Sequence, residues 1–481
     1  MSQPNLCVLL LLIFSIIYSV LSLIAIATII LYGSNPSKSL GWILIVITLP
    51  IGGVLLYVLF GVNRREFKIL TLKETEKRRL YDSNYLSKSN VDHSFLPTLK
   101  QRKLANLIAK SSNFVALEGN DVTVLNTGTQ TYKLMFDKLK KAKNYIHIQF
   151  YIFEEGDVLD EFYKIFKNKI KEGVTVRILY DAIGSMSWSN KSIKRFKNIG
   201  VEISPILPIK FGSILFNLNF RNHRKIIVID GEVGFTGGVN ISDKYVRSLS
   251  KLGIWDDEHV CIEGPAVQSL HEIFIKDYYF ATGKEVLLEE KYHKSIEKKG
   301  DKIVQIVASG PDSEYSSIMQ QYAMLIYMAD DNIYIANPYF IPTKSVLEAI
   351  KIAALSNVKV KLLIPAQSDS KMAKYSMYSN FKQLLKVGVK IYRSPNFLHS
   401  KVIVIDNELA SIGSGNFDHR SFDQNFEANA LIYSSDVATE IAGRFEKNCE
   451  KANELTLEEH ESRSLGNKLL EGVFRLFSPL L

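Results

Sequence analysis

The sequence predicts an α/β protein in which two similar domains form one shared cleft, preceded by an N-terminal hairpin of two transmembrane helices. Three observations lead to this prediction. The first 63 residues contain two long apolar runs, the rest of the chain alternates strand-like and helix-like segments, and a nine-residue motif occurs twice. The copies begin at Asn222 and Leu398, so the repeated unit is a whole domain and not a solenoid repeat of about 20–50 residues.

The N-terminal region, residues 1–63, holds two candidate membrane spans at about 6–32 and 40–62. The first carries no charged residue, and the second is interrupted only by Thr48, Pro50 and glycines. Both are long enough to cross a bilayer, which takes about 20 apolar residues. No basic segment precedes the first, as it would in a signal peptide. Two buried core helices are the alternative interpretation.

The basic residues at the ends of these runs predict their orientation. The connection GSNPSKS holds only Lys38, whereas Arg64, Arg65, Lys68 and Lys73 follow the second run. Because cytoplasmic flanks are enriched in Lys and Arg, we expect both the N-terminus and the large C-terminal part on the cytoplasmic side.

Beyond the hairpin we expect a charged juxtamembrane linker (64–112), a first α/β domain (113–295) and a second (296–481). In the first domain the patterns predict strands at 145–153, 174–181 and 201–207, with helices at 158–172 and 192–198. In the second they predict strands at 332–341, 358–365 and 389–395, with helices at 344–355 and 374–386. This order is typical of a parallel or mixed sheet with helices on both faces.

The duplicated motif reads NHRKIIVID at 222–230 and LHSKVIVID at 398–406. Strand side chains repeat every two residues, so the histidine and lysine of each copy point to the same face. The likeness continues through GEVGFTGGVN and NELASIGSGN, which end in matching asparagines. The motif aspartates, at the strand ends, are expected to fix loop geometry. The candidate residues are His223, Lys225, Asp230 and Asn240, and then His399, Lys401, Asp406 and Asn416.

Two imidazoles and two ammonium groups that converge on one cleft suit a phosphodiester substrate. Lys225 and Lys401 would neutralise its non-bridging oxygens, and the two asparagines would donate further hydrogen bonds to them. One neutral histidine attacks phosphorus, while the other, protonated, gives a proton to the leaving alkoxide. Histidine suits both tasks because its ordinary pKa lies near neutrality. The lysines supply the charge that a metal ion would otherwise provide, so we expect no metal and no other cofactor.

The two motifs resemble the HKD motifs of the phospholipase D superfamily. With the N-terminal hairpin, the chain resembles bacterial cardiolipin synthases over nearly all of its length. Further segments similar to that family are RILYDAIGS (177–185), IEGPAV (262–267), NPYFIP (337–342) and SPLL (478–481).

The resemblance implies two phospholipase D-type domains around one active site. It implies a phosphatidyltransferase that joins two phosphatidylglycerol molecules into cardiolipin and releases glycerol, through a phosphohistidine intermediate. It also implies a multi-pass protein of the bacterial inner membrane, whose partners are phosphatidylglycerol and anionic membrane lipid, with no nucleic acid. The oligomeric state stays open.

The resemblance also assigns residue roles. In this family an acidic residue behind each motif supports a histidine, and Asp257 and Glu427 stand at those positions. Where the family usually has an arginine, this chain has Asp256, which leaves the local charge balance open. His259 either lines the cleft or makes a structural hydrogen bond. The analogy favours His223 as the nucleophile.

Other functions fit the same residues. A membrane-bound hydrolase, or a transferase to another alcohol, would use the same histidines, because the outcome depends on whether water or a lipid hydroxyl reaches the phosphohistidine. A nuclease would suit the net charge of +9, but the hairpin and the lack of a dense basic and aromatic stripe count against it. A non-catalytic scaffold would be expected to lack a motif residue, and both motifs are intact. The three scattered cysteines predict no disulfide framework and no CxxC metal site.

Two apolar segments can each be interpreted in two ways. The loop 210–222, with Phe211, Phe216 and Phe220, either belongs to the core or admits lipid chains at the cleft mouth. The tail 467–481 either packs on the second domain or lies in the bilayer interface, with Lys468 and Arg475 on its polar side.

Overall fold

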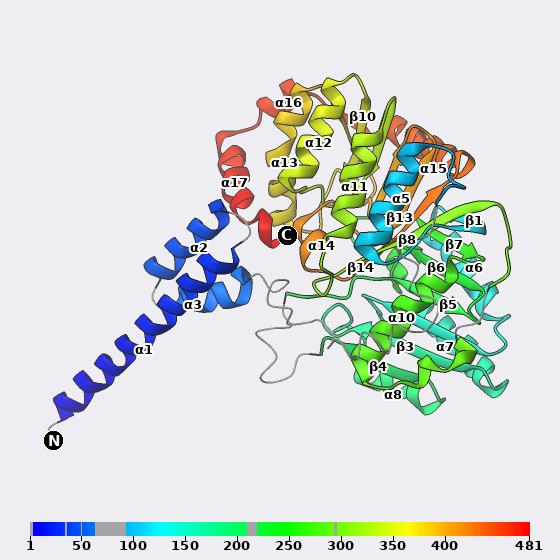
Figure 1. Cartoon of the computed structure of the whole chain (residues 1–481), viewed down its shortest axis with the longest axis horizontal. Helices are drawn as coiled ribbons and strands as arrows, with labels where there is room; N and C mark the ends of the chain where they lie inside the picture. The colour runs from blue at the N-terminus through cyan, green and yellow to red at the C-terminus, as the bar shows by residue number, and fades with distance from the viewer. Residues whose placement is uncertain (1–2, 34–35, 50, 63–92, 209–218, 293–295) are drawn as a thin grey trace. The chain divides into compact units, whose positions relative to one another are not determined.

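The computed structural model describes residues 3–33, 36–49, 51–62, 93–208, 219–292 and 296–481 (Figure 1). The chain divides into two compact units. One comprises Met1–Thr71 with Ile209–Phe220, and the other comprises Leu72–Pro208 with Arg221–Leu481. Both copies of the duplicated motif lie in the second unit.

The second unit repeats one succession of elements. Its first half consists of β1 (Leu117–Leu125), α6 (Gly128–Leu139), β2 (Tyr145–Phe150), α7 (Asp157–Lys171), β3 (Thr175–Asp181), α8 (Asn190–Asn198), β4 (Glu202–Ile206), β5 (Ile226–Ile229), β6 (Val233–Gly237), η2 (Asp243–Tyr245), β7 (His259–Glu263), α10 (Val267–Thr282), η3 (Val286–Leu288) and η4 (Glu290–Tyr292). Its second half consists of β8 (Lys302–Ser309), α11 (Ser317–Met328), β9 (Asn332–Ala336), α12 (Lys344–Leu355), β10 (Lys359–Pro365), α13 (Lys371–Lys386), β11 (Lys390–Ser394), β12 (Val402–Ile405), β13 (Leu409–Gly413), α14 (His419–Asp423), β14 (Glu427–Tyr433) and α15 (Ser435–Glu450). The chain ends with β15 (Asn453–Leu455), α16 (Leu457–Glu461), α17 (Leu465–Leu476) and η5 (Ser478–Leu480).

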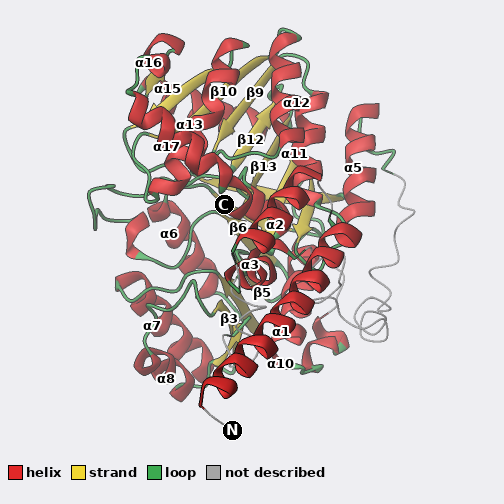
Figure 2. Ribbon diagram, turned by 90° about the vertical axis from the view of Figure 1, so that its left-hand side faces the viewer, coloured by secondary structure: helices red, strands yellow, loops and turns green. Residues whose placement is uncertain are grey.

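The strands of the described chain form one sheet in the order β15-β11-β10-β9-β12-β13-β14-β8-β1-β7-β6-β5-β2-β3-β4. The run β7-β6-β5-β2-β3-β4 of the first half matches β14-β13-β12-β9-β10-β11 of the second. The strands β2, β3 and β4 are parallel, as are β9, β10 and β11, and the remaining pairs are antiparallel. The sheet is therefore mixed, and Figure 2 shows helices on both of its faces.

The helices cover the sheet through regularly spaced apolar side chains. In α7 the buried residues recur every three or four positions, as expected for one face of a helix: Val158, Leu159, Phe162, Ile165 and Phe166. Every residue of β2 is buried, because helices cover both faces of that strand. Each half has its own hydrophobic cluster.

A helix within the predicted linker belongs to the second half. Residues 63–92 lie outside the described residues, but the remainder of 64–112 contains α5 (Leu99–Ser112), whose first turn is capped by Thr98 Oγ1 accepting from the Gln101 amide at 3.1 Å. Leu104 and Ile108 of α5 are buried in the hydrophobic cluster of the second half. The core of that half therefore includes chain that precedes the first half.

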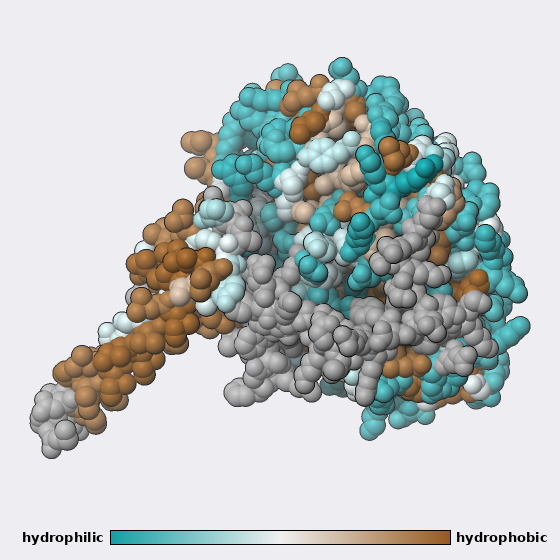
Figure 3. Space-filling view, viewed as in Figure 1, coloured by the Kyte–Doolittle hydropathy of each residue, from teal (hydrophilic) through white to brown (hydrophobic). Residues whose placement is uncertain are grey.

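The N-terminal unit contains the apolar helix α1 (Gln3–Tyr32). Its stretch Val8–Tyr32 has the length and composition of a membrane span, and Figure 3 shows hydrophobic residues along most of the helix. At 1.5 Å per residue this stretch is about 37 Å long, which exceeds a bilayer core of about 30 Å. An N-terminal apolar helix long enough to cross a membrane is therefore confirmed.

The second predicted span, 40–62, is not one continuous helix. It is divided into α2 (Pro36–Thr48), α3 (Gly52–Leu56) and the π-helical turn η1 (Tyr57–Gly61). The sequence reason for the division is Pro50, which has no amide hydrogen and disfavours helical geometry in the preceding residue. These segments still fold back on α1, where Ala25, Ile29, Val46 and Tyr57 form a small buried cluster.

Candidate active site

Each histidine of the duplicated motif is anchored on the opposite half of the second unit. The His223 amide donates to the Phe426 carbonyl at 2.9 Å, and the His399 amide donates to the Asp256 carbonyl at 2.7 Å. Nearby, β6 packs against β13 and β14. The segments that lead into β5 and β12 therefore meet where the two halves join.

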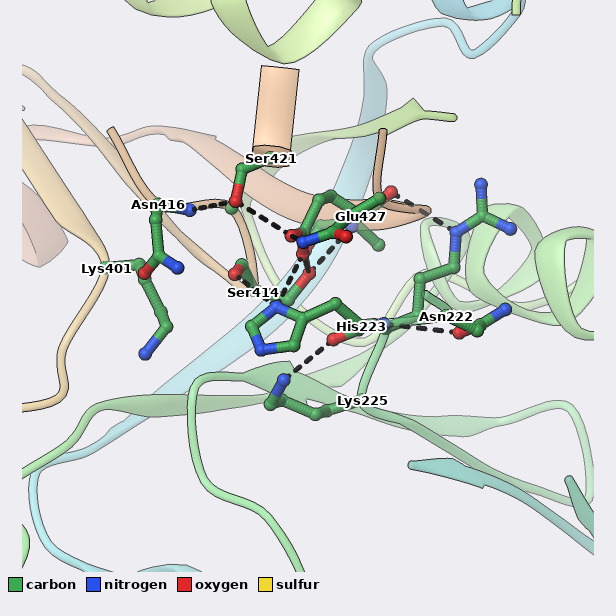
Figure 4. Close-up of polar contacts among 12 residues, drawn as sticks. Asn222, His223, Lys225, Lys401, Ser414, Asn416, Ser421 and Glu427 are labelled. Atoms are coloured by element: carbon green, nitrogen blue, oxygen red, sulfur yellow. Dashed lines mark hydrogen bonds and ion pairs between the residues drawn. The ribbon is translucent and has the colours of Figure 1, made fainter. Parts of the chain in front are cut away.

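Each imidazole is paired with a carboxylate of the other half. His223 Nδ1 lies 3.0 Å from Glu427 Oε2, and His399 Nδ1 lies 2.6 Å from Asp257 Oδ2. Figure 4 shows the first of these pairs. Because Nδ1 of each ring faces its carboxylate, Nε2 is the atom available to a substrate.

The two motif lysines are buried beside these rings. Lys225 and Lys401 are 0% and 1% exposed, whereas His223 and His399 keep 9% and 6%, so the imidazoles are the more accessible part of the cluster. Lys225 Nζ donates to the His223 carbonyl at 2.7 Å, and Lys401 Nζ lies 3.9 Å from Asp257 Oδ2. Figure 4 shows the Lys225 ammonium at the His223 carbonyl, and Lys401 Nζ lies 2.9 Å from His399 Nδ1. The structure thus brings the four predicted groups into one cluster.

The carboxylate of Glu427 is surrounded by hydrogen-bond donors. The hydroxyls of Ser414 and Ser421 donate to it at 2.5 and 2.9 Å, and Asn425 Nδ2 donates at 3.3 Å. Burial alone would raise the pKa of this carboxyl, but His223, the neighbouring lysine and Ser414 outweigh burial and leave the pKa below its ordinary value. Burial lowers the pKa of His223 to about 4 in spite of Glu427. This pair is therefore a neutral imidazole that donates to an anionic carboxylate.

The carboxyl of Asp257 has a poorer set of donors. Besides His399, the Glu258 amide donates to it at 2.9 Å. Burial raises its pKa well above the ordinary value, with Lys401 opposing and Glu258 adding to the rise. Burial also lowers the pKa of His399 well below its ordinary value, and the nearby Lys401 and Lys225 add to this. A proton shared between Asp257 and a neutral His399 fits these shifts and the short distance between the two side chains.

One position of the repeat explains part of the difference between the hydrogen-bond donors around Glu427 and those around Asp257. Gly238 of GGVN occupies the position of Ser414 in GSGN. A Cβ at Gly238 would lie 2.0 Å from Asp257 Oδ1, so a serine there would require that carboxyl to move, whereas Ser414 donates to Glu427. The two halves of the site therefore differ at a position that the duplication makes equivalent.

Aromatic side chains lie around His399, and one of them brings a hydroxyl to its imidazole. The Tyr245 hydroxyl lies 3.3 Å from His399 Nδ1, and the Trp255 ring centroid lies 5.0 Å from that of His399. Asn240 Nδ2 donates to the Tyr245 hydroxyl at 3.0 Å. Asn240 therefore supports Tyr245 in this structure, and its predicted hydrogen bond to a substrate oxygen stays a prediction.

Asn416 has a different environment from its counterpart Asn240. Its backbone amide donates to Ser421 Oγ at 3.1 Å, and its buried Oδ1 has no hydrogen-bond partner within the described part of the chain. Figure 4 shows the Asn416 side chain beside Lys401. Because Oδ1 is an acceptor, only Nδ2 of Asn416 could donate to a phosphate oxygen, and that role stays a prediction.

The motif aspartates lie at the far ends of β5 and β12 from the histidines. Each carboxylate accepts three backbone amide hydrogen bonds, Asp230 at 2.7–2.8 Å and Asp406 at 2.8–3.0 Å. These amides belong to the residues that lead into β2 and β9. Both aspartates thus hold neighbouring strand ends, in agreement with the expectation that they fix loop geometry.

The departure at Asp256 is balanced by an arginine from the other half. Arg444 of α15 forms ion pairs with Asp256 at 2.5 Å and with Glu258 at 3.1 Å. The neighbouring His259 is fully buried, and neither of its ring nitrogens has a hydrogen-bond partner in the described structure. Burial, with Lys225 nearby, lowers the pKa of His259 to about 3. The predicted structural hydrogen bond is thus absent from the described structure.

Several residues that contact the site were not predicted from the sequence. Ser414, Ser421, Tyr245 and Trp255 contact the imidazoles or their carboxylates, but only Ser414 leaves a signal, the mismatch between GGVN and GSGN. Asp181, inside the noted segment RILYDAIGS, accepts from the Asn222 amide at 2.8 Å and so fixes the residue before the first histidine.

Comparisons with known proteins agree with this geometry. A family model described as "Cardiolipin synthase, PLD-like domain" matches residues 135–282 and 322–449, and one described as "Phospholipase_D-nuclease N-terminal" matches residues 20–61. The chain is 38% identical to "Cardiolipin synthase 2" of Bacillus anthracis, over 94% of this chain and 88% of the relative. It is 38% identical to "Cardiolipin synthase" of Geobacillus thermodenitrificans, over 98% of this chain and 94% of the relative. The fold is similar to a crystal structure of phosphatidylserine synthase from Haemophilus influenzae, with a TM-score of 0.61 and 14% identity, over 79% of this chain and all of that one.

Proposed function

The chain belongs to the cardiolipin synthase family of the phospholipase D superfamily, and we propose that it joins two phosphatidylglycerol molecules into cardiolipin and releases glycerol. Membership of this family makes it a phosphatidyltransferase. The observation that carries the proposed mechanism is the crossed pairing of His223 with Glu427 and of His399 with Asp257, around two buried lysines.

In the first step, Nε2 of His223 attacks the phosphorus of one phosphatidylglycerol. A P–N bond forms while the P–O bond to the headgroup glycerol breaks, and the pair of His399 and Asp257 gives its proton to the departing glycerol oxygen. The ammonium groups of Lys225 and Lys401 stabilise the negative charge that grows on the non-bridging oxygens.

In the second step, the terminal glycerol hydroxyl of another phosphatidylglycerol attacks the phosphorus. The P–N bond breaks, and the pair of His399 and Asp257, which gave up its shared proton in the first step, accepts the proton of the attacking hydroxyl. Cardiolipin leaves with both phosphatidyl groups, and each imidazole regains its starting protonation state. One proton donor and one nucleophile therefore suffice for both steps.

The surroundings of the two carboxylates support His223 as the nucleophile. Glu427 accepts from two hydroxyls and an amide, so it can remain anionic and orient a neutral imidazole by its Nδ1–H. Within the described residues no hydroxyl donates to Asp257, and its raised pKa favours a shared proton, which suits an acid. The analogy with the superfamily leads to the same assignment.

Family membership and the apolar helix α1 indicate membrane association. We propose further that α2, α3 and η1 complete a second span, that both chain ends lie on the cytoplasmic side, and that the membrane is the bacterial inner membrane. The basic residues after position 63 support this orientation. The role of the aromatic loop in admitting lipid chains stays a prediction: Phe211 and Phe216 lie outside the described residues, and Phe220 is buried.

The function is tested by incubating the purified full-length protein with phosphatidylglycerol vesicles and measuring lipids and glycerol. Cardiolipin and glycerol in equal amounts are the expected products. Phosphatidic acid with glycerol would mean that water is the acceptor, and the synthase proposal would fail. Binding without turnover would make the protein a scaffold.

A further inference from the structure

The C-terminal helix α17 has an apolar face that the described part of the second unit leaves exposed. At 100° per residue its exposed apolar side chains fall within an arc of about 140°: Leu465, Leu469, Leu470, Val473, Leu476 and Phe477, which are 41–76% exposed. Figure 3 shows hydrophobic residues projecting from the surface over α17.

The other face of α17 fastens the helix to α13. The Phe474 ring stacks on Tyr375 with centroids 5.6 Å apart, and Ser376 Oγ donates to the Phe474 carbonyl at 2.8 Å. Glu471 is buried and ion-paired with Arg463. Since these contacts fix the orientation of the helix, the apolar face is held outward.

A basic cavity lies along one edge of this helix. It has a volume of about 540 Å³, and side chains from α13, α16 and α17 line it. Four cationic groups meet two carboxylates there: Lys382, Arg463, Lys468 and Arg475 against Glu461 and Glu471. Lys468 Nζ donates to the Glu461 carbonyl at 2.6 Å. The excess of positive charge suits an anionic group.

We propose that α17 lies in the interface of a bilayer that contains anionic phospholipid, with its apolar face among the acyl chains and a lipid phosphate in the basic cavity. On the helical wheel, Lys468 and Arg475 lie together on the polar side, about 60° and 80° beyond one edge of the apolar arc. When the arc is buried, the cavity therefore lies at the level of the headgroups, as in other interfacial helices. Because α1 already associates the chain with a membrane, this second contact is effectively intramolecular, and a weak intrinsic affinity is sufficient.

Spin-label accessibility of the full-length protein in lipid nanodiscs tests the proposal. A label at Leu469→Cys, in a Cys7→Ser background, is compared with a label at Leu355→Cys. Leu355 is 68% exposed at the end of α12, and Cys261 and Cys449 are buried. In discs with phosphatidylglycerol we expect the label at 469 to be relaxed by oxygen and protected from a water-soluble nickel complex. The label at 355 should show the reverse.

The headgroup part of the proposal has its own variant. Arg475→Glu should reduce protection at 469 in phosphatidylglycerol discs, as should replacement of that lipid by phosphatidylcholine. Equal nickel accessibility at 469 and 355 would overturn the interfacial placement. Protection that is indifferent to both changes would overturn the phosphate site, and protection that appears only with two protein molecules per disc would make the face a contact between copies of this chain. None of these readouts needs turnover, so they are independent of the proposed reaction.

Discussion

Isosteric changes of the two buried carboxylates should separate the nucleophile from the acid. Glu427→Gln keeps the shape of the side chain but replaces the anionic acceptor of His223 Nδ1–H by a neutral one. Asp257→Asn keeps an acceptor for His399 but removes the site that shares its proton. Two leaving groups distinguish the consequences: glycerol, which must be protonated as it leaves, and p-nitrophenolate, which leaves as an anion.

The expected magnitudes follow from the contacts. A hydrogen bond to a charged group contributes about 1.5–3 kcal/mol and a neutral one about 1 kcal/mol. Loss of the charge on Glu427, 3.0 Å from His223 Nδ1, should therefore cost about 0.5–2 kcal/mol and slow phosphorus attack by about twofold to thirtyfold, at 1.36 kcal/mol for each factor of ten, with either leaving group. Loss of general acid catalysis costs about 10²–10⁴ in rate, so Asp257→Asn should lose that factor with phosphatidylglycerol and almost none with the nitrophenyl ester.

The assay is stopped-flow release of p-nitrophenolate from phosphatidyl-p-nitrophenol, beside glycerol release from phosphatidylglycerol, with the full-length protein in mixed micelles. Rapid quenching and peptide mass spectrometry should locate the phosphatidyl group on His223. The reasoning is refuted if Asp257→Asn slows both substrates equally while Glu427→Gln slows only phosphatidylglycerol, or if the adduct is found on His399.

Three further predictions concern packing, stability and pH. Gly238→Ala should displace the Asp257 carboxyl, because the new Cβ would lie 2.0 Å from its Oδ1. The rate of glycerol release should fall at least as much as in Asp257→Asn. The control is Gly443→Ala, which should keep full activity because a Cβ there meets nothing within 4 Å. Asp406→Ala removes the acceptor of three amide hydrogen bonds and should lower the free energy of unfolding by about 1–3 kcal/mol. The activity per folded molecule in the same preparation should stay near that of the parent protein. A large loss of that activity would contradict the structural role of Asp406. Burial lowers the pKa of Lys225 from 10.5 to about 7, so its ammonium form is present below that pH and lost above it: kcat/KM should fall as the pH rises through about 7. The same depressed pKa makes the free energy of unfolding rise with pH from about 7 towards 10.5, because the penalty for the buried charge disappears. Urea unfolding at several pH values measures this rise, and a free energy of unfolding that does not increase over this range would contradict the desolvation of Lys225.

Much of the α/β framework was predictable because its signals are local. The helix predicted at 344–355 coincides with α12, and the strand predicted at 174–181 coincides with β3 to within one residue. The strand predicted at 332–341 ends at Ala336, because Pro338 and Pro342 lack the amide hydrogens that a longer strand would use.

The features of the site that could not be predicted from the sequence depend on contacts between residues that are distant in the chain. The motif spacing identified His223 and His399, but nothing local shows that the acid of each half supports the histidine of the other. The asparagines stand at matching positions, yet Tyr245 of η2, in a β6–β7 connection that is longer than the β13–β14 connection, gives Asn240 a different partner.

The crossed carboxylates have an evolutionary consequence. A lone half would carry a histidine without its acid and an acid without its histidine, so an ancestral single-repeat chain could have worked only as a pair of identical subunits, each completing the other. Fusion of two such copies into one polypeptide released them from that symmetry. Gly238 and Ser414 show that the two halves now differ beside their carboxylates, as the proposed division between attack and proton transfer would require.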